Sequence, residues 1–171
     1  MSDAKSNILA RIKQAGAAQT DPLNRAHISV HDWDMEERIG KFTLRMEAVR
    51  AEVYRCDKEP WTSVLSKVCE EKSIGNLLYA PDAQWGDDIK QLADSETSFP
   101  ELSLYDQDIE EWKQEMFYQT DAGITSSLGG IAETGTLILW PDAEEPRMMS
   151  LVPPVHIAIL EIDKLYTTFA E

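Results

Sequence analysis

Basic residues are scarce in this chain, and long apolar runs are missing. Lys and Arg number 16 against 31 Asp and Glu, which leaves a formal net charge of −15 at pH 7. A surface of this charge repels nucleic-acid phosphates and anionic lipid, so neither is expected as a partner. No apolar run approaches the roughly 18 residues of a membrane-spanning helix, and charges interrupt the N-terminal stretch where a signal peptide needs its apolar core. We therefore expect a cytoplasmic protein.

Cysteine is nearly absent as well. Cys56 and Cys69 are the only two, and they form no CxxC motif, which argues against a disulfide framework, a zinc site or an iron–sulfur site. His27 and His31 have the four-residue spacing of metal ligands on a helix, but the surrounding sequence reads as a linker and offers no third ligand. We expect neither a metal nor any other cofactor in this chain.

The 171 residues suit one α/β domain preceded by an arm. Residues 1–32 are predicted to form a helical N-terminal arm and linker, and residues 33–171 the domain. Asp34 and Glu37 are placed as a capping box at the start of the clearest amphipathic helix, whose apolar stripe is read as core. If that stripe were exposed instead, the chain would be an interaction module.

Short apolar runs then alternate with helical patterns, which predicts a three-layer α/β/α fold with a mostly parallel sheet. The last part is expected to be β-rich, with a turn at 141–146. The predicted strands are 53–56, 76–80, 102–105, 122–125, 136–140, 147–152 and 155–162, and the predicted helices begin near residues 60, 85 and 108.

Ligands of open parallel sheets bind beyond the carboxyl ends of the strands. This rule selects the loops at 81–82, at 106–108 and at 126–130, of which the last leads to Glu133. Ser126 and Ser127 offer hydroxyl groups there, and Gly129 and Gly130 would let backbone amides approach an oxyanion. The alternative is an ordinary turn between strands, since serine and glycine are common in any turn.

Glu133 and His156 are the candidate catalytic residues. Glu133 precedes an apolar run, where desolvation would raise its pKa and suit it to act as a base or nucleophile; alternatively it accepts backbone N–H bonds and fixes a turn. His156 lies on an apolar strand and is either a base or a hydrogen-bonded core residue. Residue chemistry alone leaves both choices open.

Arg147 and Ser150 could hold an anionic group through the guanidinium fork and the hydroxyl. A salt bridge from Arg147 to Glu144 or Glu145 is the alternative. The chain contains neither a dinucleotide-binding nor a phosphate-binding glycine loop, and it has no nucleophile elbow or HExxH motif.

Three segments together resemble the LUD domain of the lactate utilisation protein C family (LutC, YkgG). They are AGIT at 122–125, IAETGTL at 131–137 and SLVPPVHI at 150–157, and the opening NILARIKQ is similar to that family's N-terminal helix. Taken from these segments and from the loop and anion-binding residues considered above, the candidate substrate-binding residues are Thr125, Ser126, Gly129, Gly130, Thr134, Gly135, Thr136, Arg147 and Ser150.

The resemblance implies a NagB/RpiA/CoA-transferase-like fold and a part in oxidising L-lactate to pyruvate alongside iron–sulfur partner proteins. An enzyme acting alone on a small carboxylate or acyl substrate is the alternative. Members of that family continue for some tens of residues beyond the HIAIL strand, so we expect a truncated or short member here. An uncovered sheet edge would then favour self-association.

Overall fold

The computed structural model describes residues 4–14, 31–105 and 117–171. The chain divides into two compact units, residues 1–32 and residues 33–171. The first contains α1 (Ala4–Gln14), on which Ile8 and Leu9 are exposed. His27, the loop predicted at 106–108 and the helix predicted after it lie outside the described residues. None of the helices within the described ranges is long and apolar enough to cross a membrane.

The second unit contains both strands and helices. Its elements within the described residues are α2 (Met35–Ala48), α3 (Trp61–Glu71), β1 (Asn76–Tyr79), α4 (Gly86–Ser95), β2 (Glu101–Leu104), β3 (Ala122–Ser126), β4 (Gly129–Ile131), β5 (Thr136–Ile138), α6 (Met148–Leu151), β6 (Val155–Ile159), the 3-10 helix η2 (Ile162–Lys164) and β7 (Leu165–Tyr166).

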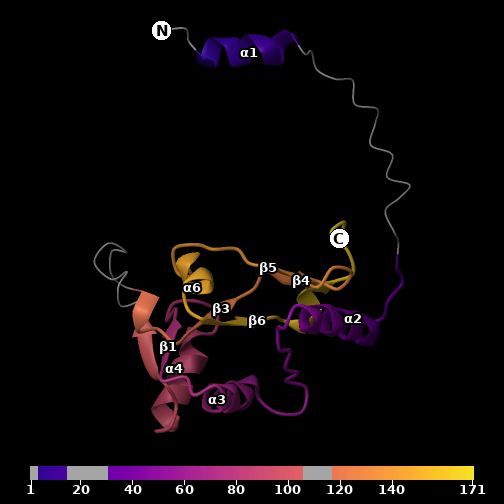
Figure 1. The fold of residues 1–171 in the computed structure, drawn as a ribbon. Coiled ribbons are helices and arrows are strands. Elements are labelled where there is room, and N and C mark those ends of the chain that lie inside the picture. The colour runs from indigo at the N-terminus through magenta and orange to yellow at the C-terminus, as the bar shows by residue number, and fades with distance from the viewer. Residues whose placement is uncertain (1–3, 15–30, 106–116) are drawn as a thin grey trace. The chain divides into compact units, whose positions relative to one another are not determined.

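The main sheet is parallel and has the strand order β2-β1-β3-β6. Helices α3 and α4 pack on one face, where Leu65 of α3 and Ile89 of α4 share a core with Leu77 and Ile124 of the sheet. Helix α6 lies on the opposite face (Figure 1), and its Met149 shares a buried cluster with Leu78 of β1. The predicted α/β class with a parallel sheet is confirmed, with α3 and α4 on one face and the short helix α6 on part of the other.

A second, three-stranded sheet has the order β5-β4-β7, with β4 and β5 forming an antiparallel hairpin. Helix α2 packs against it, because Phe42 shares a buried cluster with Ala132 and Leu165. Most of the predicted stripe on α2 is therefore core, although Val49 at its end is 73% exposed. The last part of the chain, expected to be β-rich, contains β5, β6 and β7 but also the helix α6 and the 3-10 helix η2, so the expectation holds only in part.

Helix α2 begins where its sequence signals a start. The Asp34 carboxylate accepts the N–H of Glu37 at 2.9 Å, and the Glu37 carboxylate accepts the N–H of Asp34 at 3.3 Å. These two bonds satisfy backbone donors that have no partner inside the helix. The predicted capping box is confirmed.

Two predicted strands are wrong. Residues 53–56 form no regular element, and Tyr54 and Arg55 instead bond the carboxylates of Glu52 and Glu36 at the surface. Residues 147–152 contain the helix α6, because the residues after Pro146 are good helix formers and the Met149 N–H bonds the Pro146 carbonyl at 2.9 Å. An apolar run this short does not distinguish a strand from a buried helical turn.

Candidate functional site

The carboxyl ends of β1, β3 and β6 meet beside the start of α4. A small hollow of about 190 Å³, including its open mouth, lies there. Its wall is apolar where Ala80, Ala83 and Trp85 contribute, and polar where Ser126 and Glu145 do. This is the edge where the topology of a parallel sheet places ligands.

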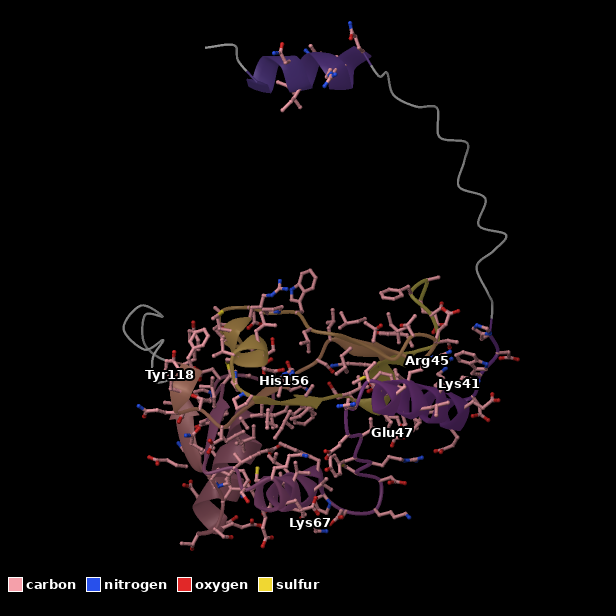
Figure 2. All side chains as sticks on the ribbon, in the orientation of Figure 1. Lys41, Arg45, Glu47, Lys67, Tyr118 and His156 are labelled. Carbon is pink, nitrogen blue, oxygen red and sulfur yellow. The ribbon has the colours of Figure 1, made fainter. Side chains whose placement is uncertain are left out.

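Thr125 and His156 face each other on this part of the sheet. Ala122 and Ile124 of β3 point into the core beneath α3 and α4, so Thr125 points to the opposite, α6 side. Val155 and Ile157 of β6 pack against the same core, so His156, labelled in Figure 2, also points to the α6 side. Thr125 Oγ1 and His156 Nε2 are 2.9 Å apart. Burial lowers the pKa of His156, which keeps the imidazole neutral near pH 7 and able to accept a proton.

Ser126 binds a carboxylate that sequence reasoning did not assign to the site. Its backbone N–H donates to Glu145 Oε1 at 2.9 Å and to Oε2 at 3.1 Å, and its hydroxyl donates to Oε2 at 2.5 Å. Asp142 shapes the loop that carries this glutamate, since its carboxylate accepts the N–H groups of Glu144 and Glu145. In the sequence, Asp142 is a signal for such a turn, because aspartate often bonds backbone N–H groups two or three residues later. The sequence does not indicate that Glu145 bonds Ser126.

Glu133 lies in the turn of the β4–β5 hairpin. It is half-buried, and its N–H donates to the Thr167 carbonyl at 3.0 Å. The hydroxyls of Thr134 and Thr136 are 2.8 Å apart across the same turn. Gly135 has φ +66°, a conformation that favours glycine. The AETGT motif thus builds a hairpin, and a catalytic role for the Glu133 carboxylate stays a prediction.

The predicted turn at 126–130 is wrong in its second half, because Gly129 and Gly130 begin the central strand β4. A Cβ on Gly129 would come within 2.8 Å of the Lys164 carbonyl, and one on Gly130 within 2.9 Å of the Leu160 side chain. Close packing against neighbouring parts of the domain explains both glycines. This arrangement does not present them in an open ligand loop.

Arg147 and Ser150 lie at α6. Arg147 is exposed, and the Ser150 hydroxyl donates to its carbonyl at 3.0 Å within the same helical turn. Among the described residues, no salt bridge joins Arg147 to Glu144 or Glu145. The anion-binding role of Arg147 and Ser150 is still a prediction.

The structure thus separates the predicted site residues into groups. Thr125 meets His156 on the α6 side of the main sheet, and Ser126 meets Glu145 at the carboxyl edge of the sheet. Glu133 belongs instead to the second sheet, in the turn between β4 and β5. In the parts of the chain that the structure describes, no three His, Cys, Asp or Glu side chains gather as metal ligands do.

Together, the fold and the site define an α/β domain with a polar site at the edge of a parallel sheet, where the N–H and O–H of Ser126 donate to a carboxylate. The sequence profile of the LUD domain matches residues 39–171. The chain belongs to the LUD domain family.

Relatives of known sequence agree with this family. The chain is 36% identical over 174 residues to an uncharacterized protein of Neisseria meningitidis serogroup B, covering 97% of this chain and 72% of that one. It is 31% identical over 130 residues to Lactate utilization protein C 1 of Bacillus mycoides, covering 73% of this chain and 53% of that protein. The chain thus spans about half the length of the second relative.

Two further proteins are similar, one over a short stretch and the other at low sequence identity. The uncharacterized electron transport protein YkgF of Escherichia coli is 34% identical over 58 residues, which cover 34% of this chain and 12% of that protein. A crystal structure of a DUF162 family protein from Deinococcus radiodurans superimposes with a TM-score of 0.62 at 19% identity, covering 81% of this chain and 77% of that one. This last comparison shows a shared fold.

Proposed function

We propose that this chain is a LutC-like component of an L-lactate utilisation system. The observation that carries the proposal is the LUD domain match over residues 39–171 together with the 31% identity to Lactate utilization protein C 1. The shorter likeness to a protein named as an electron transport protein supports a redox setting.

The site suits a component that handles a small carboxylate. Ser126 offers an N–H and an O–H to a carboxylate, and the neutral His156 beside Thr125 can accept a proton. Oxidation of L-lactate to pyruvate releases two protons and two electrons. The His156 imidazole can accept one of the two protons, and we assign the second proton and both electrons to other proteins.

Iron–sulfur partner proteins are the electron acceptors in this proposal. A cluster is held by four thiolates or a similar set, and this sequence contains two cysteines. Burial raises the pKa of the Cys69 thiol to about 11, so this side chain stays protonated at neutral pH. Free thiols and an acidic composition are consistent with a cytoplasmic protein.

In the alternative, a stand-alone enzyme, Glu133 would act as base, Arg147 would bind the substrate carboxylate, and the Gly129–Gly130 amides would bind the oxyanion. Glu133 lies in the hairpin turn, Arg147 at the start of α6, and the two glycines inside β4. The three groups thus come from three different elements, and the two glycines are packed closely against Lys164 and Leu160. We therefore favour the component over the stand-alone enzyme.

Deletion of the gene in its host tests the proposal. The deletion strain should fail to grow on L-lactate as carbon source and should grow normally on pyruvate, because pyruvate enters after the oxidation step. Normal growth on L-lactate would overturn the proposal. Purification of the tagged protein from lactate-grown cells should recover iron–sulfur proteins with it, and purification from pyruvate-grown cells serves as the control.

A further inference from the structure

The carboxylate of Glu145 lies at the point where a parallel sheet usually binds its ligand. Ser126 is the last residue of β3, an inner strand of the main sheet, and it donates both its N–H and its hydroxyl to this carboxylate. A hydroxyl-to-carboxylate distance of 2.5 Å belongs to a charge-assisted bond. The domain therefore carries donors that recognise a carboxylate, and it supplies one itself.

Glu145 reaches this point from a surface segment. Residues 140–144, which precede it in the connection from β5 to α6, are all exposed, and Trp140 is 72% exposed. The segment is shaped by the Asp142 carboxylate and joined to β3 through Glu145. Release of the Glu145 carboxylate would thus expose little buried apolar surface from the residues just before it.

The hollow beside Glu145 is small in the free protein. It continues from Ser126 onto the apolar side chains of Ala80, Ala83 and Trp85, but its 190 Å³ includes open solvent, and the enclosed part is about 10 Å³, roughly the space of one water molecule. A small acid therefore fits here only when the Glu145 side chain, which lines the hollow, moves out.

We infer that the Ser126 N–H and hydroxyl form a carboxylate-binding point that Glu145 occupies in the free protein, and that a short-chain organic acid binds there by displacing Glu145. The carboxylate of the acid takes over the hydrogen bonds from Ser126, and its short carbon chain lies against the apolar wall. This inference rests on the proposed function only for the choice of L-lactate as probe.

To bind Ser126, the external acid must compete with Glu145, a carboxylate of the same protein molecule. A group tethered by a short flexible segment acts at an effective concentration on the order of millimolar, so an external acid competes when it reaches a similar concentration. The apparent Kd equals the intrinsic Kd divided by the fraction of molecules with the point open. If that fraction is about one tenth, removing Glu145 lowers the apparent Kd about tenfold.

Titration of the full chain with L-lactate, and separately with acetate, tests this inference. Binding is followed through the backbone amide resonance of Ser126 in nitrogen–proton NMR spectra. Glu145→Ala should lower the apparent Kd about tenfold. Glu144→Ala is the matched control, since it removes the same charge from the neighbouring position, whose side chain does not bond Ser126; it should leave the Kd within about twofold.

A second variant makes the result independent of any one substitution. Asp142→Ala removes the acceptor that shapes the loop and leaves Ser126 and Glu145 in place, so it should also tighten binding. Adding Ser126→Ala to Glu145→Ala should weaken binding again. Unchanged affinity in folded Glu145→Ala or Asp142→Ala protein would overturn the inference. So would a Ser126 resonance that does not move in the wild-type protein at saturating L-lactate.

Failure here is distinct from failure of the proposed function. Displacement of Glu145 by L-lactate with normal growth of the deletion strain would keep the binding point and reject the lactate-utilisation role. Loss of growth on L-lactate with no response at Ser126 would keep the role and reject this binding point.

Discussion

Thr125 Oγ1 lies 2.9 Å from His156 Nε2, across two neighbouring parallel strands. The register places Thr125 opposite Ala158 and His156 opposite Gly123, so the contact runs diagonally on the face that carries α6. Gly123 has no side chain to obstruct it. This pair joins a residue proposed for substrate binding to a residue proposed for catalysis.

A double-mutant cycle measures the strength of this contact. Thr125→Val keeps the shape of the side chain and removes the hydroxyl, and His156→Leu removes the imidazole. We expect a coupling free energy of about 1 kcal/mol in urea unfolding, as for other partly buried hydrogen bonds. Additive effects of the two substitutions would show that the contact contributes nothing to stability.

His156 should make stability depend on pH in a defined direction. Burial lowers its pKa in the folded protein, so between that pKa and the unfolded value of about 6.5 the unfolded chain binds more protons. The contribution is fully present above about pH 6.5 and is lost as pH falls through the folded pKa. The free energy of unfolding should fall from pH 7.5 to 5.5 more steeply in the wild type than in His156→Leu, and equal slopes would contradict this account.

Gly135→Ala should destabilise the domain. Gly135 has φ +66°, and an added Cβ would lie 2.5 Å from the Arg45 Cβ on α2. Strain of this kind costs about 1–3 kcal/mol, before the steric clash is added. Gly40→Ala is the matched control, because a Cβ at Gly40 meets nothing within 4 Å and alanine favours the helix α2. We expect a lower midpoint of thermal unfolding for the first and an equal or higher one for the second.

Asp34→Ala should weaken the start of α2. It removes the acceptor for the Glu37 N–H and with it the capping box, at a typical cost of about 1 kcal/mol. Asp32→Ala removes the same charge two residues earlier, where the side chain does not cap the helix, and should change stability by less than about 0.5 kcal/mol. The free energy of unfolding of the two variants is compared by chemical denaturation in the same buffer. Equal losses of stability would show that the negative charge, and not the capping bond, is what stabilises the helix.

The elements that sequence predicted best are those with strong local signals. Helices α2, α3 and α4 follow amphipathic stripes, and β1 ends just before Pro81 as its apolar run suggests. The errors at 53–56 and 147–152 concern short segments. There the local pattern is compatible with more than one conformation, and tertiary contacts decide between them.

The sequence also identified some residues of the site and missed others. Ser126 and His156 could be named because each lies at or near one end of an apolar strand. The partner of Ser126 could not, because Glu145 lies 19 residues away, beyond a hairpin whose direction of return no local signal encodes. The sequence of the AETGT motif is compatible with a ligand loop or with a turn, and its backbone geometry is that of a hairpin turn.

By itself, then, the sequence determined the class of fold, the helix starts and the segments that carry the family's motifs, since these depend on periodicity, capping and short-range backbone preferences. Only the tertiary structure decided that Thr125 meets His156, that Ser126 holds Glu145, and that Glu133 lies in the hairpin turn between β4 and β5. The physical reason is that each of these contacts joins strands and loops whose spacing is set by packing of the whole domain.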